Sequence, residues 1–296
     1  MSTATDSPQP LVVCFGEILW DFLPDALYPG GAPLNVGYHL SRHGCSVHLV
    51  SAVGADALGE ELRRRLVAWG LDASGVRRQP HRPTGIVRTQ LSAEGVPAYD
   101  IARNVAWDGI EPGGRSLAAA RKASAFVFGS LAQRSSANQQ SLEQLLDVIP
   151  ESALRVFDVN LRPPHIDRPL LRRLARRATL LKLNAAEAAY LAGNDDPAPG
   201  REERDARILA ERSGCASIVV TSGARGAGWL RAGTWHWEPA RRVKIADTVG
   251  AGDAFLAALV AGLLLTPEAT PAKLLAAACR RGEWVARHRG ATPAYG

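Results

Sequence analysis

The chain has 296 residues, of which 46% are hydrophobic, so it can bury a sizeable core as one large α/β domain. Its formal charge of +6 raises nucleic acid as a partner, but the basic residues are scattered over helix-like segments with apolar spacing, as on solvated helix faces, so we expect no nucleic-acid partner. No stretch approaches ~20 uninterrupted apolar residues, so we expect no membrane span.

The cysteines and the N-terminal residues indicate the cellular compartment of the protein. The four cysteines show neither a CxxC pair nor metal-ligand spacing, and we expect them to be reduced and buried. The first ten residues are polar and lack the basic start of a signal peptide. We therefore expect a cytoplasmic protein.

The N-terminal part predicts alternating strands and helices. Leu11 to Leu19 is an apolar run typical of a buried first strand, and Val47 to Val50 predicts a second one. Between them, a glycine turn at Gly30-Gly31 precedes a helix-like segment that runs to His43. Leu58 to Trp69 then has the spacing of an amphipathic helix.

The segment from Thr84 to Arg103 departs from this alternation. Two strand-like runs flank the turn signal Ser92-Ala-Glu-Gly95, which is typical of a β-hairpin. We expect a single domain over residues 1–296, with a lid formed by segments of about 20–34 and 84–108. Pairing two lids would cover the exposed edges of the hairpin, so a homodimer through the lid is a further expectation.

Strands and helices alternate again from residue 117. Short apolar runs separated by helix-like segments are typical of a parallel sheet covered on both faces. In open sheets of this kind, ligands bind beyond the carboxyl ends of the strands. The predicted strands end in polar groups, at which we expect a site: Ser130, Asp158, Asn160, Asn184 and Thr221.

The stretch Asp247-Thr-Val-Gly-Ala-Gly-Asp253 precedes an apolar helix over Ala254 to Leu265. Its three small residues allow the backbone to fold tightly, so that several N–H groups converge at the helix start and attract an anion. A carboxylate at Asp253 would face that anion, an arrangement that suits phosphoryl transfer to a hydroxyl. The alternative interpretation is a helix start capped by Asp247 or Thr248.

Other signatures of nucleotide, metal and hydrolase sites are absent. The chain has no GxxxxGK[ST], no GxGxxG directly after a strand and no GxSxG. His39 and His43 lie four residues apart on a predicted helix, without an acid or a third ligand. We interpret them as a solvent-facing pair and not as a metal site.

Two distant motifs together resemble the signature regions of the ribokinase-like (PfkB) carbohydrate kinases: Gly30-Gly31-x-x-x-Asn35 and the stretch from Asp247 to Asp253. The segment Asn184-Ala-Ala-Glu187 resembles the family's Asn-x-x-Glu motif, and Thr221 to Gly226 resembles its nucleotide-phosphate turn. The resemblance covers essentially the whole chain. It implies a ribokinase-like α/β fold, in which a central, mostly parallel sheet is flanked by helices on both faces and carries a small β lid.

The resemblance also implies roles for individual residues. Asp253 would be the base that takes the proton of the sugar hydroxyl, with anion-hole amides from Gly250, Ala251 and Gly252. The sugar would contact Asp21, Gly31, Asn35, Arg103 and Arg162. ATP would be bound by Asn184, Glu187, Thr221, Gly223 and Gly226. Asn184 and Glu187 would act on Mg²⁺ through water, and backbone carbonyls near Asp247 and Val249 would hold K⁺.

Structural alternatives exist for some of these roles. Asn184 with Glu187 at its third position is also the pattern of a capped helix start. Thr221 and Gly223 would also fit an ordinary tight turn, and Arg162 would also fit an ion pair with Asp158.

Four segments are similar to the fructokinase branch of the family: Gly16 to Asp21, Gly30 to Asn35, Phe128 to Leu131 and Phe157 to Pro163. The hairpin end, Ala102 to Asp108, also resembles 2-keto-3-deoxygluconate kinases. We therefore predict an ATP-dependent fructokinase, with 2-keto-3-deoxygluconate, ribose or a nucleoside as alternative acceptors.

The alternative from another class is a non-catalytic, basic nucleic-acid-binding or regulatory protein. The intact run from Gly250 to Asp253 argues against it. Trp107 and Cys279 depart from the family pattern, so the lid contacts, the exact sugar and the nucleotide preference stay open.

Overall fold

The computed structural model describes residues 9–22, 26–91, 97–194 and 198–295. Within them, a nine-stranded sheet has the order β13-β12-β11-β10-β9-β8-β1-β4-β5. From β11 to β5 every neighbouring pair is parallel, whereas β12 and β13 add an antiparallel edge. The strands are β1 (Leu11–Phe15), β4 (Ser46–Gly54), β5 (Val76–Gln79), β8 (Ala125–Gly129), β9 (Leu154–Asp158), β10 (Leu180–Asn184), β11 (Ser217–Thr221), β12 (Gly226–Arg231) and β13 (Thr234–Pro239).

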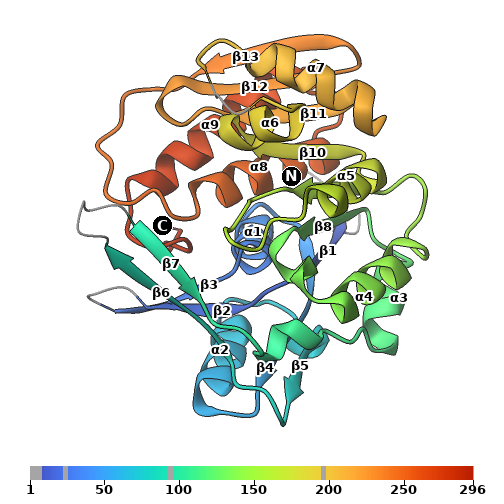
Figure 1. The fold of residues 1–296 in the computed structure, drawn as a ribbon, viewed down its shortest axis with the longest axis vertical. Coiled ribbons are helices and arrows are strands. Elements are labelled where there is room, and N and C mark those ends of the chain that lie inside the picture. Colours follow the sequence, from blue (N-terminus) through green and yellow to red (C-terminus); the bar gives the residue numbers. More distant parts are fainter. Residues whose placement is uncertain (1–8, 23–25, 92–96, 195–197, 296) are drawn as a thin grey trace, which may run out of the picture.

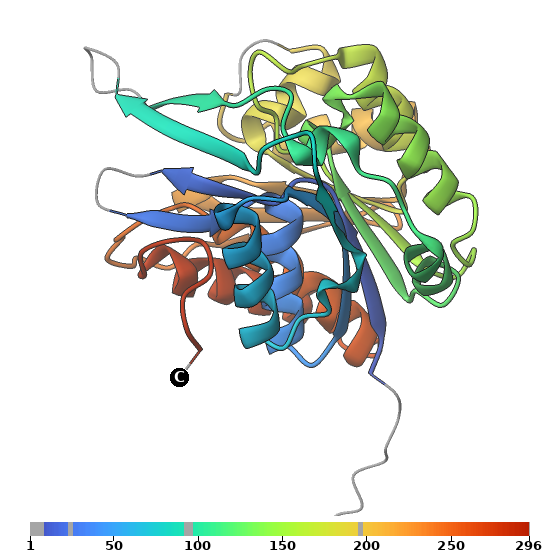
Figure 2. The ribbon, with the colours of Figure 1, turned by 90° about the horizontal axis from the view of Figure 1, so that it is seen from below.

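Helices cover both faces of this sheet, as Figures 1 and 2 show. Successive side chains of β8 alternate between the two cores: Phe126 and Phe128 belong to one, Ala125 and Val127 to the other. Helices α3 to α7 cover the first core, and α1, α2, α8 and α9 cover the second. The helices are α1 (Ala32–Arg42), α2 (Ala57–Ala68), α3 (Gly114–Ala120), α4 (Ser136–Leu146), α5 (Arg168–Arg177), α6 (Ala185–Ala192), α7 (Glu202–Ser213), α8 (Ala251–Leu265) and α9 (Pro271–Ala286). The predicted fold class is confirmed.

A second, four-stranded sheet projects beside the main sheet, with the order β3-β2-β6-β7 (Figures 1 and 2). It contains β2 (Leu19–Phe22), β3 (Leu27–Gly30), β6 (Gly85–Leu91) and β7 (Pro97–Ile101). Its β6 and β7 pair in antiparallel fashion, as a hairpin requires, while the predicted turn at residues 92–95 lies outside the described residues. The sheet draws on the two segments for which we predict a lid.

Two expectations about strands need correction. The single strand predicted from Leu11 to Leu19 is divided at Gly16, whose φ of 145° turns the chain from β1 in the main sheet into β2 of the second sheet. The edge strands β12 and β13 were not predicted, because β12 carries two glycines and β13 is largely exposed, so neither gives a strong apolar signal.

The described helices include none with both the length and the apolar character needed to cross a bilayer. The most apolar stretch is α8, and it packs within the molecule against α1 and α9. Consecutive residues from Asp253 to Ala261 are buried, so this part of α8 is buried around its circumference. A helix buried on all sides is apolar all round, which explains why α8 has no clear amphipathic period.

Leu259 and Leu265 of α8 provide a matched test of this packing. Leu259 is 0% exposed and Leu265 is 43% exposed. We expect Leu259→Ala to cost about 2–5 kcal/mol of unfolding free energy, because it leaves a cavity in a close-packed core. Leu265→Ala should stay within about 0.5 kcal/mol of the wild type. Urea unfolding followed by circular dichroism measures both, and equal losses would contradict the assigned packing.

Candidate active site

The polar strand ends lie along one edge of the main sheet. In the strand registers, Gly129 pairs with Asp158, Asp158 with Lys182, and Asn184 with Thr221. These strands are parallel, so the residues that end them share the carboxyl edge, where open α/β sheets bind ligands. The chain folds so that this edge faces the starts of α1 and α8.

The start of α8 is held by a backbone hydrogen bond and not by a side-chain cap. No side chain among the described residues caps this helix, and its N-cap is Gly250, in the left-handed region at φ 77°. The Ala251 N–H donates to the Thr248 carbonyl at 3.3 Å. The carboxylate of Asp247 instead accepts the N–H groups of Val249 and Gly290, at 3.0 and 3.1 Å. The capped-helix interpretation is therefore wrong, and the uncapped amides together with the helix dipole favour an anion.

Asp253, in the first turn of α8, is joined to α1. Asn35 Nδ2 donates to Asp253 Oδ2 at 2.8 Å, across 218 residues of sequence. Both side chains are buried, and Asp253 is 8% exposed. Burial raises the pKa of Asp253, while Lys182, the hydrogen bond from Asn35 and the charge of Arg162 oppose that rise. The structure thus brings the early and the late motif into direct contact.

A buried cation lies beside the start of α8, which the sequence analysis missed. Lys182 Nζ lies 2.9 and 3.2 Å from the two carboxylate oxygens of Asp158. A Cβ added at Gly252 would lie 3.1 Å from Nζ. Burial alone would lower the pKa of Lys182, but the carboxylates of Asp158, Glu187 and Asp253 hold it above its ordinary value, so the ammonium stays charged. The sequence signal was a lysine within the apolar strand β10.

Two glycines allow the backbone to pass close to the Asp21 carboxylate and to the backbone of Glu17. A Cβ at Gly30 would lie 2.1 Å from Asp21 Oδ2, and one at Gly31, whose φ is 108°, would lie 2.3 Å from the Glu17 carbonyl. Burial raises the pKa of Asp21 to about 6, partly offset by Arg162. Electrostatic effects of Asp253 on both Asp21 and Glu17 show that this corner adjoins Asp253.

Glu17 is a second residue that the sequence analysis missed. It is 4% exposed, its Oε1 accepts the Ala32 N–H at 3.3 Å, and its Oε2 is buried without a hydrogen-bond partner among the described residues. Burial raises the pKa of Glu17 to about 7. Its only sequence signal was an acid directly after Gly16, between two apolar runs.

Arg162 and Arg103 occupy different places. Arg162 follows the strand end of β9, and its charge acts on Glu17, Asp21 and Asp253. Arg103, after β7, is exposed and lines a separate hollow with Arg82, Asn104, Arg134 and His165. The Trp107 ring is buried beneath Arg134, 3.9 Å from the guanidinium carbon.

A cavity of about 610 Å³ runs from the β11–β12 turn to the start of α8. Three residues predicted to bind the nucleotide line it (Thr221, Gly223 and Gly226), together with Ala251 and Gly252. Phe255, Cys279, Gly282 and Ala286 form its apolar wall. A cavity that is apolar on one side and ends at free helix amides suits a flat ring attached to phosphates.

Asn184 and Glu187 form the capping box that the sequence left as an alternative. Asn184 Oδ1 accepts the Glu187 N–H at 2.9 Å, and Glu187 Oε2 accepts the Asn184 N–H at 2.8 Å. Glu187 Oε1 also accepts the Leu161 N–H at 2.8 Å. Each carboxylate oxygen keeps a lone pair, which fits contact with a hydrated divalent cation through water. Within the described residues, no three His, Cys, Asp or Glu side chains form a direct metal-binding group.

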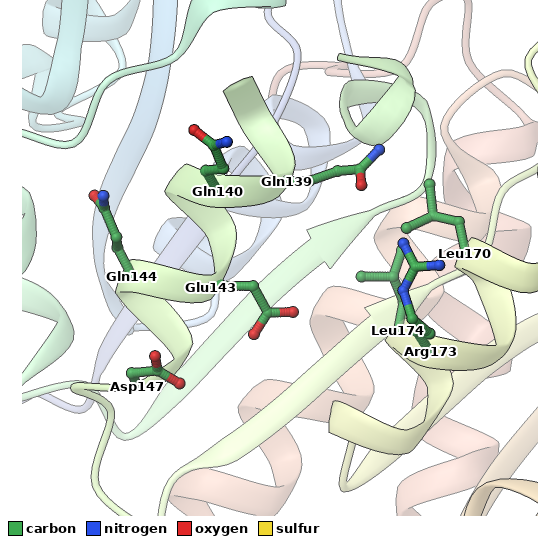
Figure 3. Close-up of a pocket in the computed structure, with 8 residues that line it drawn as sticks. All are labelled: Gln139, Gln140, Glu143, Gln144, Asp147, Leu170, Arg173 and Leu174. Atoms are coloured by element: carbon green, nitrogen blue, oxygen red, sulfur yellow. The ribbon is translucent and has the colours of Figure 1, made fainter. Parts of the chain in front are cut away.

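Another hollow, between α4 and α5, holds none of the predicted site residues (Figure 3). Gln139 and Glu143 of α4 face Leu170 and Leu174 of α5 there. Ion pairs from Arg177 to Glu143 and Asp147 link the two helices beside it. None of the strand-end residues described above lines it, and we assign it no role.

Comparisons with known proteins identify the family and the fold of the chain. Residues 12–295 match the model of the pfkB family carbohydrate kinases. A fructokinase of Solanum tuberosum is 27% identical over 96% of this chain and 92% of its own length. The crystal structure of an uncharacterized sugar kinase from Pyrococcus horikoshii is similar, with a TM-score of 0.81, 26% identity and coverage of 95% and 93% of the two chains. A Vibrio cholerae fructokinase with bound fructose, ADP and calcium has a TM-score of 0.82 at 23% identity, covering 96% and 95%, and shows the shared fold.

The raised pKa of Glu17 predicts a specific pH dependence of stability. A carboxyl whose folded-state pKa is raised stabilises the fold below about pH 4.5, and this contribution is lost as pH rises through about 7. Because Glu17→Gln cannot ionise, its stability relative to the wild type should increase between pH 5 and pH 8. Thermal unfolding at both pH values measures this, with the exposed Glu268→Gln as the control. A Glu17→Gln difference that does not change with pH would show that Glu17 does not titrate as assigned.

Proposed function

Because the chain belongs to the PfkB family of carbohydrate kinases, we propose that it transfers the γ-phosphate of ATP to a sugar hydroxyl, with fructose as the substrate. The observation that carries this proposal is the Asn35–Asp253 hydrogen bond. It joins a buried carboxylate in the first turn of α8 to the helix that follows the Gly30-Gly31 turn, and Ala251 and Gly252 of the same turn of α8 line the 610 Å³ cavity. That arrangement provides both a base for a hydroxyl and a place for a phosphate.

In the proposed reaction, the nucleotide lies in the cavity with its γ-phosphate at the first amides of α8. Gly250, Ala251 and Gly252 supply these amides, which receive the negative charge that spreads over the phosphoryl oxygens. Asp253 takes the proton of the attacking hydroxyl, and its raised pKa brings it closer to the working pH of a general base. Lys182 places a fixed positive charge beside the same amides.

On the sugar side, Asp21 and Asn35 would bind hydroxyl groups, and Gly31 allows the ring to approach the backbone. Arg162 carries a positive charge toward the carboxylates of this corner, where it would contact the sugar or the transferred phosphoryl group. The four-stranded sheet would act as a lid that excludes water, since a kinase must avoid hydrolysing ATP.

On the nucleotide side, Thr221, Gly223 and Gly226, which line the cavity, would contact the phosphates of ATP. Asn184 and Glu187 would hold Mg²⁺ through water. Bound with ATP, Mg²⁺ would neutralise phosphate charge. A K⁺ site at the carbonyls of Asp247 and Val249, a cytoplasmic location and a homodimer through the lid stay predictions.

Fructose is favoured over other acceptors by the segments similar to fructokinases and by the similarity of the chain to several fructokinases. One observation supports a second candidate substrate. Arg82 and Arg103 line a hollow that would suit a carboxylate, although Asp108 also lines it and pairs with Arg134, so 2-keto-3-deoxygluconate belongs in any substrate comparison.

The first test measures ADP release with MgATP over fructose, 2-keto-3-deoxygluconate, ribose, glucose and adenosine. We expect a kcat/KM for fructose at least about 10-fold above that for the other acceptors, a margin that one or two hydrogen bonds to hydroxyls provide. ATP hydrolysis without an acceptor should be slow. Equal or absent turnover on every acceptor would refute the fructose assignment.

The second test replaces the proposed base. Asp253→Asn should lower kcat by on the order of 10³-fold or more, since it removes proton transfer from the attacking hydroxyl. ATP affinity, measured by calorimetry, should change little. Asp147→Asn, at the exposed end of α4, is the control and should retain wild-type turnover. A fully active Asp253→Asn variant would show that another group is the base.

A further inference from the structure

His39 was expected to face solvent, and that expectation is wrong. Its side chain is 0% exposed, and both ring nitrogens are bonded. Nε2 lies 2.9 Å from the Ala291 carbonyl oxygen, and Nδ1 lies 2.8 Å from the Tyr295 hydroxyl. A carbonyl oxygen only accepts, so Nε2 carries the proton and Nδ1 accepts from Tyr295. The partners lie more than 250 residues away, which is why the local helix pattern did not show them.

Residues 290–295, which we name the C-terminal strap, connect three parts of the site. At one end, the Gly290 N–H donates to Asp247, and a Cβ at Gly290 would lie 2.9 Å from the ring of Tyr28 in β3. Further along, the Pro293 carbonyl accepts the Tyr38 hydroxyl at 2.9 Å. The strap thus spans the loop before α8, the second sheet and α1.

The strap supports the N-cap of α8 directly. Ala291 is 3% exposed, and a Cβ added at Gly250 would lie 2.5 Å from its Cα and 2.9 Å from its carbonyl oxygen. That carbonyl is the one that accepts the His39 N–H. Any movement of Ala291 therefore changes the surface against which the left-handed Gly250 packs, and with it the orientation of the first amides of α8.

His39 and Asn35 lie four residues apart on α1, so they project from the same face of the helix. Asn35 holds Asp253, and His39 holds Ala291. One rigid face of α1 thus bonds to the proposed base and to the support of the proposed anion hole. The distance between these two groups must stay fixed if a hydroxyl and a phosphate are to meet in line.

The His39 ring stays neutral under ordinary conditions. Burial lowers its pKa to about 4, and the charge of nearby Arg281 acts in the same direction, although the Ala291 bond opposes it. The tautomer assigned above is therefore retained at neutral pH.

We propose that His39 is a positioning residue for phosphoryl transfer, which holds the C-terminal strap so that Gly250 presents the first amides of α8 beside Asp253. This inference rests on the proposed function, since it takes those amides as the anion hole. It predicts that loss of the His39 bonds slows the chemical step more than it weakens binding of either substrate.

The test compares three variants with a matched control. His39→Leu removes both bonds, His39→Gln keeps an N–H donor that can reach Ala291, and Tyr295→Phe removes only the hydroxyl. The control is His43→Leu. His43 belongs to the same cluster, with its ring 6.4 Å from that of Tyr295, but its Nε2 has no partner among the described residues.

We expect His39→Leu to lower kcat on the best acceptor by on the order of 10–100-fold, with smaller changes in both KM values, because misplacing a reacting group acts on the transition state. His39→Gln should recover most of that loss, and Tyr295→Phe should cause a smaller one. His43→Leu should keep wild-type kcat even if its melting temperature falls as far as that of His39→Leu. A folded His39→Leu variant with wild-type kcat, or equal losses in His39→Leu and His43→Leu, would overturn the inference. If His39→Leu does not fold, the comparison of His39→Gln and Tyr295→Phe with His43→Leu decides by the same criteria.

A binding measurement separates this inference from the proposed function. If the wild-type chain phosphorylates no acceptor, the proposed function has failed. Calorimetry then measures the affinities for ADP and for a non-hydrolysable ATP analogue. The difference between the two affinities reports how well the first amides of α8 bind the γ-phosphate. His39→Leu should lose the wild-type preference for the analogue, whereas an unchanged preference, or none in the wild type, would overturn the positioning role.

Discussion

The hydrogen bond between Asn35 and Asp253 is the contact on which the rest of the site depends. It holds a carboxylate that burial has made costly to ionise, and it does so with a donor from the opposite end of the sequence. An amide donor suits this task, because it stabilises the ionised form without neutralising it as a direct ion pair would. This hydrogen bond therefore fixes the position of the carboxylate that we propose as the base.

Carboxyl groups outnumber cations around this contact, and burial raises the pKa of each of these carboxyl groups. Glu17, Asp21, Asp158, Glu187 and Asp253 are carboxyl groups at or near the edge of the sheet, and Lys182 and Arg162 are the cations whose fields reach them. Lys182 is held by Asp158 and also lies against Gly252, so one ammonium serves the buried acids and the start of α8. A phosphate arriving at the amides would meet a local field that the backbone and Lys182 have already made positive.

The topology of the main sheet explains how residues from distant parts of the sequence come together at one edge. The parallel strands place their polar ends along one edge, and the two helices that carry the motifs, α1 and α8, pack against each other on one face of the sheet. The chain passes from β1 into β2 of the second sheet through Gly16, Glu17 and Ile18, so three residues connect the two sheets at this point. The C-terminal strap then fastens the loop before α8 to α1 and to β3.

The sequence by itself determined the local features. The glycine run before α8 predicted free amides, the strand ends predicted a polar edge, and the apolar runs predicted the parallel sheet, because each of these depends on neighbours within a few residues. Only the tertiary structure decided the burial of Glu17, the Lys182–Asp158 pair and the bonds of His39. A lysine in a strand or a histidine on a helix has the same local pattern whether it faces water or a partner, and those partners come from distant segments that meet only in the fold.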